Sequence, residues 1–241
     1  MKLVCLGDSL THGYKVKQLE TWPSLVRQAL NIEVVNKGIN GDTTGGMLAR
    51  LYADVIAVQP SHVVIMGGGN DFIWGVPITV VEANLAAMVQ QAVHHSIIPM
   101  LGVPIPIAVS KAKKYWPFVN NFINSETPTS ISGCSDFHFG GGRLPHRSLD
   151  VQLKLNEFTE VNKSLEELRT WIFSFAKSFS VTVVDFYQCF VDEQNAVLPA
   201  LYCDGLHPTP TGNELMSGVF LKQGIVAGVF GDINTDNKDK G

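Results

Sequence analysis

Short apolar runs alternate with longer stretches of helical spacing along most of this chain, and this alternation constrains the possible fold more than any other feature. Runs of this length suit buried strands. We expect strands at about 1–7, 32–36, 62–66, 97–103 and 181–185, and helices at about 21–30, 44–58, 80–95, 155–178 and from 211 onward. Because strands separated by helices pair in parallel, the pattern predicts an α/β protein with about five mainly parallel strands and helices on both faces of the sheet.

Individual residues mark where some of these helices begin and end. Thr21 is a suitable N-cap for the helix at 21–30, and Pro23 is tolerated in its first turn. Pro60 ends the helix that begins near residue 44. These residues support the two helices independently of their apolar spacing.

Neither helical nor strand spacing is visible between residues 104 and 151. A segment of this length without regular structure in a compact domain is usually functional or mobile. We expect one domain over residues 1–231, with an inserted loop at about 104–152 that leaves the carboxyl end of a strand. The lysines and aromatic residues at 111–118 belong either to a solvated loop or to a lid that selects the substrate. Residues 232–241 form a polar tail that we expect to be disordered.

Composition and charge exclude several classes of protein. The chain has 241 residues, of which 45% are hydrophobic and 17% charged, as is typical of a globular protein with a sizeable core. Its net charge of -4 argues against non-specific nucleic-acid binding. No apolar run approaches the ~20 residues of a membrane-spanning helix, so we expect no membrane span. The cysteines lack metal-binding spacing and are expected to be free thiols: Cys5, Cys134, Cys189 and Cys203.

A serine follows the first expected strand, in the sequence Gly7-Asp8-Ser9-Leu10. Ligands bind at the carboxyl ends of strands in open α/β sheets, so the hydroxyl of Ser9 is well placed for chemistry. A serine is a weak nucleophile unless a base accepts its proton and donors stabilise the oxyanion. Asp204 and His207 lie on a loop before the last helix, where the carboxylate can hold one imidazole nitrogen and leave the other free. Ser9, His207 and Asp204 can therefore form a triad.

Two further segments, residues 36–42 and 67–71, contain groups that can donate hydrogen bonds to an oxyanion. Each segment follows an apolar run that we expect to be a strand. Both segments should therefore lie at the same edge of the sheet as Ser9.

The position of Ser9 also bears on localisation. A nucleophile this close to the start of the chain leaves no room for a secretory signal that could be cleaved without destroying the site. We therefore expect a cytoplasmic protein.

Four sequence blocks occur in order: Gly-Asp-Ser-Leu near the amino terminus, Asn-x-Gly-x-x-Gly, Gly-x-Asn-Asp and a late Asp-x-x-His. Together they resemble the GDSL esterase/lipase family, or SGNH hydrolases. The resemblance implies a three-layer α/β/α sandwich of flavodoxin-like architecture. It also implies Ser9 as nucleophile, His207 as base and Asp204 as the residue that orients the base. The segment between residues 104 and 153 matches no block of the family.

The same resemblance implies an oxyanion hole formed by the backbone N–H groups of Ser9 and Gly38 and by the side-chain amide of Asn70. Gly38→Ala is then expected to leave the fold intact and to impair turnover, whereas Asn70→Ala removes a donor. Asp8 and Asp71 are expected to have structural roles in their turns.

These residues predict a serine hydrolase that cleaves carboxylic esters through an acyl-enzyme on Ser9, without a metal or another cofactor. The expected substrate is a short-chain acyl or acetyl ester of a small soluble molecule or carbohydrate. An acyl thioesterase or a lysophospholipase could use the same site, and a carbohydrate- or lipid-binding module on this scaffold is the non-enzyme alternative. The histidines that could suggest a metal lack the spacing of metal-binding motifs: His94, His95, His138 and His146.

Overall fold

The computed structural model describes residues 1–116 and 157–226. Five parallel strands form one sheet in the order β2-β1-β3-β4-β5. The strands are β1 (Lys2–Gly7), β2 (Glu33–Gly38), β3 (His62–Met66), β4 (Ile98–Val103) and β5 (Thr182–Asp185). The α-helices are α1 (Ser9–His12), α2 (Trp22–Leu30), α3 (Thr44–Leu51), α4 (Gly69–Ile73), α5 (Ile78–His94), α6 (Val109–Tyr115), α8 (Phe158–Phe179) and α9 (Pro210–Val226). This strand order is that of flavodoxin-like folds, so the predicted parallel α/β architecture is confirmed.

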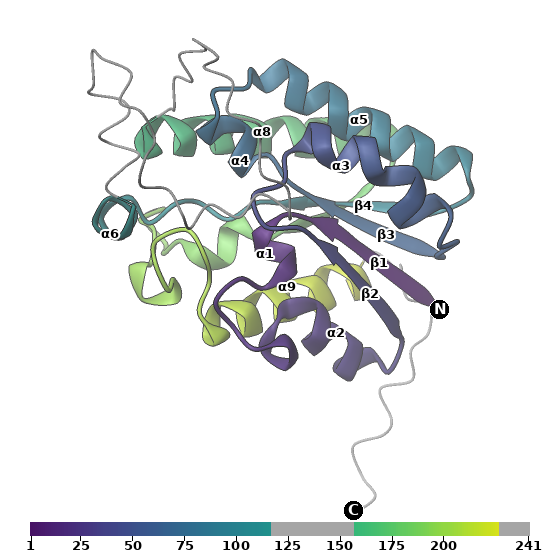
Figure 1. Ribbon diagram of the computed structural model, residues 1–241, viewed down its shortest axis with the longest axis horizontal. Helices are drawn as coiled ribbons and strands as arrows, with labels where there is room; N and C mark the ends of the chain where they lie inside the picture. The colour runs from purple at the N-terminus through teal and green to yellow at the C-terminus, as the bar shows by residue number, and fades with distance from the viewer. Residues whose placement is uncertain (117–156, 227–241) are drawn as a thin grey trace, which may run out of the picture.

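Helices cover both faces of the sheet (Figure 1). α3, α5 and α8 lie over one face, and α2 and α9 pack together over the other. Because both faces are covered, all the residues of β3 and nearly all those of β1 are buried. Strands buried on both faces appear in the sequence as continuous apolar runs, which is the pattern that predicted them.

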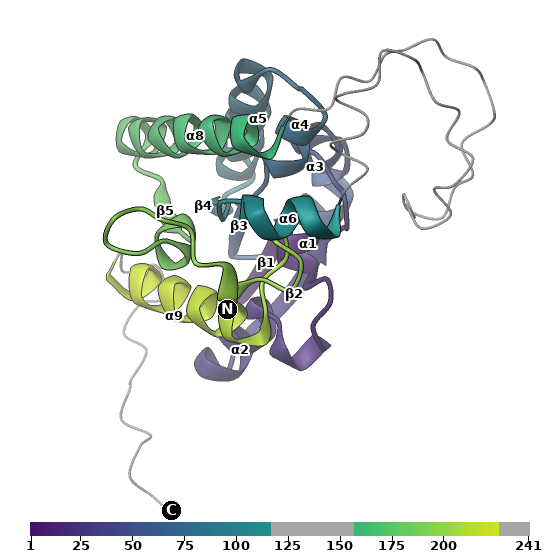
Figure 2. The ribbon, with the colours of Figure 1, turned by 90° about the vertical axis from the view of Figure 1, so that its left-hand side faces the viewer.

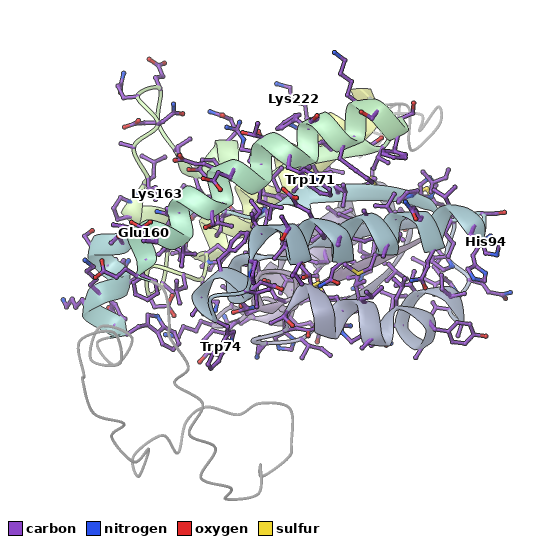
Figure 3. The ribbon with its side chains drawn as sticks, turned by 90° about the horizontal axis from the view of Figure 1, so that it is seen from above. Trp74, His94, Glu160, Lys163, Trp171 and Lys222 are labelled. Atoms are coloured by element: carbon purple, nitrogen blue, oxygen red, sulfur yellow. The ribbon has the colours of Figure 1, made fainter. Side chains whose placement is uncertain are left out.

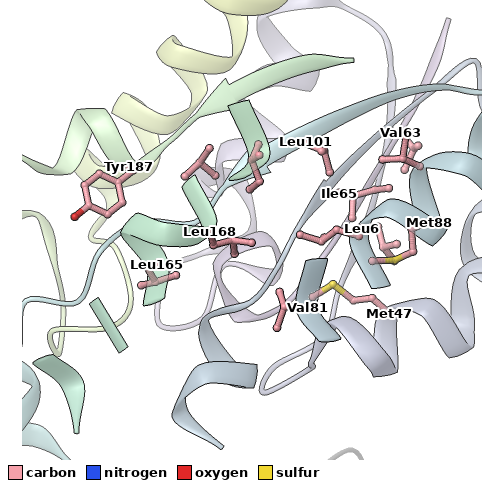
Figure 4. Packing of buried hydrophobic residues seen from close by; sticks show 14 of the residues in the cluster. Leu6, Met47, Val63, Ile65, Val81, Met88, Leu101, Leu165, Leu168 and Tyr187 are labelled. Carbon is pink, nitrogen blue, oxygen red and sulfur yellow. The ribbon is translucent and has the colours of Figure 1, made fainter. Parts of the chain in front are cut away.

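Hydrophobic cores fill the space on each side of the sheet. In the larger core, Figure 4 shows side chains of the strands meeting those of α3, α5 and α8, among them Leu6, Ile65, Leu101, Met47, Met88 and Leu168. In the smaller core, the rings of Trp22 and Phe220 lie 5.6 Å apart and join α2 to α9. The indole of Trp22 also donates to the carbonyl of Leu10. A hydrogen bond therefore joins this smaller core to α1, the helix that begins at Ser9.

Most helices begin and end within a few residues of the predicted positions. Thr21 caps α2 with its hydroxyl, and Pro23 lies in the first turn, as predicted. The helix predicted at 44–58 is α-helical only as far as Leu51 and continues as a π-helical turn, Tyr52–Ile56. The sequence spacing did not predict α1, α4 or α6, because one or two helical turns are too short to show a periodic pattern.

Part of the predicted insertion is described by the structure. Residues 104–108 lead without regular structure from β4 into α6, so residues 109–115 of the insertion are helical. The rest of the inserted loop and the polar tail at 232–241 lie outside the described residues. Among the helices that the structure describes, none is both long and apolar enough to cross a membrane. The three cysteines in these parts of the chain are free thiols: Cys5, Cys189 and Cys203.

The chain changes direction across the sheet between β1 and β3. β2 lies on one side of β1, and β3, β4 and β5 follow on the other side. In open α/β sheets, the carboxyl ends of the two strands at such a reversal form the ligand-binding edge. Figure 2 looks onto this edge, with α6 in front of the strands and α1 beside it.

Candidate active site

Ser9 is the first residue of α1, and only Asp8 separates it from the end of β1. The carboxylate of Asp8 caps this short helix by accepting the N–H of Leu10 at 2.9 Å. Gly13, with a φ of 86°, ends the helix, and its N–H donates to the carbonyl of Ser9 at 3.0 Å. Among the described residues, none accepts a hydrogen bond from the N–H of Ser9. The turn therefore presents both the hydroxyl and the N–H of Ser9 at the carboxyl edge of the sheet.

The late loop brings an acid and a base to the same hydroxyl. One carboxylate oxygen of Asp204 accepts the backbone N–H groups of Leu206 at 3.0 Å and His207 at 2.9 Å, which fixes the loop. The other oxygen lies 2.9 Å from Nδ1 of His207. Nε2 of His207 lies 3.0 Å from Oγ of Ser9. The three residues that the sequence predicted as a triad are thus hydrogen-bonded in series, and all three are buried.

The charge of Asp204 decides which ring nitrogen of His207 carries the proton. Burial acts to raise the pKa of Asp204, but hydrogen bonds from the side chain and backbone of His207 and from the backbone of Leu206 outweigh burial and hold that pKa well below its usual range. An ionised carboxylate can only accept hydrogen bonds, so Nδ1 of His207 must be the donor. Nε2 then has a free lone pair that accepts the hydroxyl of Ser9.

α6 packs closely on the loop that carries the acid and the base. The N–H of Ala108 donates to the carbonyl of Gly205 at 2.9 Å. Gly205 has a φ of 92°, and a Cβ at this position would lie 2.2 Å from the backbone nitrogen of Ala112. Lys111 donates from its ammonium to the carbonyl of Tyr202. The first part of the insertion is therefore bound to the triad loop, and Lys111 has a structural role there.

Two aromatic rings lie against His207. The ring of Tyr14 is 4.5 Å from the imidazole, and that of Trp116 is 6.1 Å away. Tyr14 follows α1, whereas Trp116 follows α6, so the two rings approach from different segments. The remainder of the predicted lid, from residue 117 onward, lies outside the described residues.

α4 brings Asn70 to the edge of the sheet that carries Ser9. Its Nδ2 donates to the carbonyl of Asp42 at 2.8 Å and lies 3.4 Å from Oδ2 of Asp8. Asp71 instead accepts the N–H and the hydroxyl of Thr44, at 2.9 and 2.7 Å. The amide of Asn70 therefore lies beside the nucleophile turn, while Asp71 has the structural role expected of it, linking α4 to the start of α3.

The structure does not support the role predicted for Gly38. Its N–H is engaged, donating to Oδ1 of Asn36 at 2.9 Å. A Cβ at Gly38 would lie 2.1 Å from the backbone nitrogen of His12, so the expectation that Gly38→Ala leaves the fold intact is wrong. Gly41, in the same segment, has a φ of 76°, and its N–H has no hydrogen-bond partner in the part of the chain that the structure describes. Its neighbour Asp42 accepts the amide of Asn70, so Gly41 is the better placed glycine.

Asp8 is a buried acid beside other acids. Burial raises its pKa most, the hydrogen bond from Leu10 lowers it, and the charges of Asp71 and Asp42 raise it further, to about 7. Arg50 links one of these acids to the end of β1, since its guanidinium contacts Oδ2 of Asp42 at 2.8 Å and the carbonyl of Gly7 at 3.0 Å. The nucleophile turn therefore contains a carboxyl group that titrates near neutral pH.

Of the histidines considered for a metal site, the two that the structure describes lie away from the triad. Figure 3 shows His94 at the carboxyl end of α5, far from Glu160 at the start of α8. The ring of His95 lies edge-on to that of His94, with 5.1 Å between the ring centres. This end of α5 leads into the start of β4, at the opposite edge of the sheet from the triad. No group of three or more potential metal ligands occurs within the described residues, and His138 and His146 lie outside them.

Sequence patterns missed Lys15 and Tyr14 as neighbours of the triad, whereas Trp116 belongs to the insertion that was expected to leave the carboxyl end of a strand. Lys15 contacts Asp204, from the opposite end of the chain, with its Nζ 3.0 Å from Oδ2. Nothing in the sequence near residue 15 marks a partner there. For Tyr14, the one signal was its closeness in sequence to the Ser9 turn.

Comparison with known proteins identifies the family of this chain. The GDSL-like Lipase/Acylhydrolase family matches residues 5–215. An arylesterase from Vibrio mimicus is 42% identical over 93 residues, which are 36% of this chain and 46% of that protein. The chain thus spans about half the length of this relative. An acetylxylan esterase from Geobacillus stearothermophilus is 26% identical over 92% of this chain and 93% of its own.

A solved structure gives the same result for the fold. The structure of a putative lipolytic protein of the G-D-S-L family from Desulfitobacterium hafniense superimposes with a TM-score of 0.67 at 27% identity. The superposition covers 92% of this chain and 98% of that one. With the family match extending over most of the chain and the triad assembled at the expected edge, this protein belongs to the GDSL-like lipase/acylhydrolase family.

Proposed function

We propose that this protein is a serine hydrolase of carboxylic esters, acting on short-chain acyl or acetyl esters of a small molecule or a carbohydrate. The observation that carries the proposal is the geometry of the triad. A buried Asp204 holds Nδ1 of His207, and Nε2 of His207 lies 3.0 Å from Oγ of Ser9. A neutral serine needs an oriented base of this kind to act as a nucleophile at neutral pH.

In the proposed reaction, Oγ of Ser9 attacks the ester carbonyl carbon while Nε2 of His207 accepts the hydroxyl proton. The carbonyl electron pair moves onto oxygen and forms the tetrahedral oxyanion. Its collapse breaks the bond to the alcohol, which takes the proton from His207, and leaves the acyl group on Ser9. Water then attacks this acyl-enzyme and gives a proton to Nε2. A second collapse breaks the bond between the acyl carbon and Oγ, which takes the proton back from Nε2, so the acid is released and Ser9 and His207 are restored.

Three donors are proposed for the oxyanion. The N–H of Ser9 is the first, because it has no partner among the described residues. The amide of Asn70 is the second, since one of its hydrogens is held by the carbonyl of Asp42 and the other only by the 3.4 Å contact to Asp8. For the third donor, the N–H of Gly41 replaces that of Gly38, which is engaged with Asn36. Donors fixed in advance in this way stabilise negative charge without reorganising during the reaction.

The carbohydrate ester is favoured among substrates because the acetylxylan esterase from Geobacillus stearothermophilus aligns with nearly the whole chain. The match to the arylesterase covers little more than a third of the chain. An acyl thioesterase or lysophospholipase would use the same triad, so the identity of the acyl group and of the leaving group distinguishes these alternatives.

The first experiment measures hydrolysis of p-nitrophenyl esters from acetate to palmitate. We expect activity that is highest on the short acyl groups and that is lost in Ser9→Ala and His207→Ala. Ser178→Ala is the matched control, because the hydroxyl of Ser178 is exposed and its one hydrogen bond among the described residues is to the carbonyl of Ser174, within α8. Equal hydrolysis by wild type and Ser9→Ala would contradict the proposal.

Further substrates separate the alternatives. Release of acetate from an acetylated oligosaccharide would support the carbohydrate ester, whereas preference for long-chain acyl-CoA would favour a thioesterase. A fluorophosphonate probe that labels wild type and spares Ser9→Ala would exclude a pure binding module, because labelling requires an activated serine.

A further inference from the structure

The turn after α1 holds a lysine in an uncommon backbone conformation. Lys15 has a φ of 67°, in the left-handed region that residues with a Cβ rarely adopt. The N–H groups of Gly13 and Tyr14 both donate to the carbonyl of Ser9, and the N–H of Val16 donates to that of Gly13. The carbonyl of Ser9, the proposed nucleophile, therefore accepts two of the hydrogen bonds that hold this turn. An unfavourable conformation persists where the surrounding contacts determine it, so the contacts of Lys15 are informative.

The side chain of Lys15 reaches the acid of the triad. Its Nζ lies 3.0 Å from Oδ2 of Asp204, the oxygen that also lies 2.9 Å from Nδ1 of His207. The side chain of Asp204 is fully buried, whereas that of Lys15 is 38% exposed. A cation and the base therefore share one oxygen of the same carboxylate.

Three aromatic rings surround this ammonium. Its Nζ lies 5.7 Å from the ring centre of Tyr14, 5.8 Å from that of Tyr115 and 6.0 Å from that of Trp116. These distances are within the range of cation–π attraction. Lys15 therefore joins three segments: the turn after α1, the end of α6 and the loop that carries Asp204.

We propose that Lys15 is a positioning residue of the triad, which shares Asp204 with His207 and thereby keeps the imidazole neutral to a lower pH. The inference rests on the proposed function, in which neutral His207 is the base that accepts the proton of Ser9. A carboxylate that faces His207 alone stabilises the imidazolium with its full charge. With the ammonium on the same oxygen, that stabilisation is smaller, so the base stays unprotonated in more acidic solution.

The charges around Lys15 and Asp204 support the expected effect of Lys15 on His207. Burial acts to lower the pKa of Lys15, but its hydrogen bond and attraction to Asp204 outweigh burial and raise that pKa, so the ammonium stays charged at neutral pH. Within residues 1–116 and 157–226, the other ionisable groups near Lys15 and Asp204 are Tyr14, Tyr115, Cys203 and Lys111. Lys111 is a cation too, but it donates to the carbonyls of Pro199 and Tyr202 rather than to Asp204.

The expected effect follows from the separation of the charges. Because Nζ and Nδ1 both contact Oδ2 of Asp204, they are at most about 6 Å apart. Repulsion between two unit charges at this separation corresponds to about half a pH unit in water and about two units at the lower effective dielectric of a protein surface. Loss of the Lys15 charge should move the acidic limb of the activity profile to higher pH by an amount in this range.

The test is the pH dependence of kcat/KM for p-nitrophenyl acetate between pH 5 and 9. The neutral variants Lys15→Met and Lys15→Gln are both expected to shift the acidic limb to higher pH by about half a unit or more. Lys15→Arg keeps the charge and should keep the limb of wild type. Lys17→Met is the matched control, because the side chain of Lys17 is 87% exposed and pairs only with Glu20.

The outcomes separate electrostatic from structural roles. If both neutral variants lose activity equally at every pH, with the limb unmoved, the inference is overturned, because a structural defect lowers the whole curve. Should wild type lack hydrolysis that depends on Ser9, the proposed function fails. The inference is then decided by NMR titration of the ring of His207, assigned with His207→Asn. A titration midpoint that is the same in wild type and Lys15→Gln overturns it, and a midpoint raised in the variant supports it.

Discussion

Replacing Asp8 with asparagine should change how the stability of this protein depends on pH. The pKa of Asp8 is raised from 3.8 to about 7, chiefly by burial. An acid with a raised pKa in the folded state contributes stability that is fully present below its unfolded pKa and is lost as pH rises through about 7. A rise of about three units corresponds to about 4 kcal/mol, of which about 3 kcal/mol should be lost between pH 5 and pH 8. Asparagine does not ionise and is an equally good N-cap, so Asp8→Asn removes this loss.

The assay is urea unfolding, followed by tryptophan fluorescence, of wild type and Asp8→Asn at intervals from pH 5 to 9. The difference in the free energy of unfolding, Asp8→Asn minus wild type, should increase by about 3 kcal/mol over this range and become constant above pH 8. Asp54→Asn is the control. Burial acts to raise the pKa of Asp54, but hydrogen bonds from Lys37 and Arg50 lower it, so Asp54 is ionised throughout this range. Its variant should differ from wild type by a constant amount. A constant difference for Asp8→Asn as well would show that Asp8 is already ionised at pH 5.

Four further substitutions test the site and its packing. Asn70→Ala should lower kcat/KM by about 10²–10³ with the circular dichroism spectrum unchanged. Asn84→Ala is the control and should keep the kcat/KM of wild type, because the amide of Asn84 donates to Thr44, outside the triad. Equal activity of the two variants would exclude Asn70 as a donor. Gly38→Ala should cost about 3 kcal/mol or more, measured by urea unfolding, because its Cβ would meet the backbone of α1. Gly218→Ala should instead stabilise the protein by about 0.5–1 kcal/mol, because Gly218 lies on α9 with no atom within 4 Å of the added Cβ. Similar effects of Gly38→Ala and Gly218→Ala on stability would contradict the packing described for Gly38.

Much of the fold was predictable because its signals are local and repeated. Strands buried on both faces give continuous apolar runs, and the helices between them give a spacing that any single substitution barely disturbs. The same regularity placed Ser9 at the end of the first strand and Asn70 after the third. Parallel strands bring their carboxyl ends to one edge, so these residues had to meet there.

The contacts within the site were less predictable. The sequence motif that includes Gly38 and Gly41 contains two glycines and does not say which N–H is free. Only the close approach of α1 to Gly38, and the capture of its N–H by Asn36, distinguish them. α6 was missed for a different reason, since seven residues give too little periodicity to separate a helix from a loop.

The sequence by itself determined that this chain forms a parallel α/β sheet and that a serine, a histidine and an aspartate gather at its carboxyl edge. The tertiary structure alone decided the electrostatics of that edge: the buried Asp8 beside two other acids, and Lys15 on the same oxygen of Asp204 as His207. The physical reason is that hydrophobic periodicity is a property of neighbouring residues. Charge interactions depend instead on burial and on distances between segments that are remote in the chain, and both exist only once the sheet and its helices have packed.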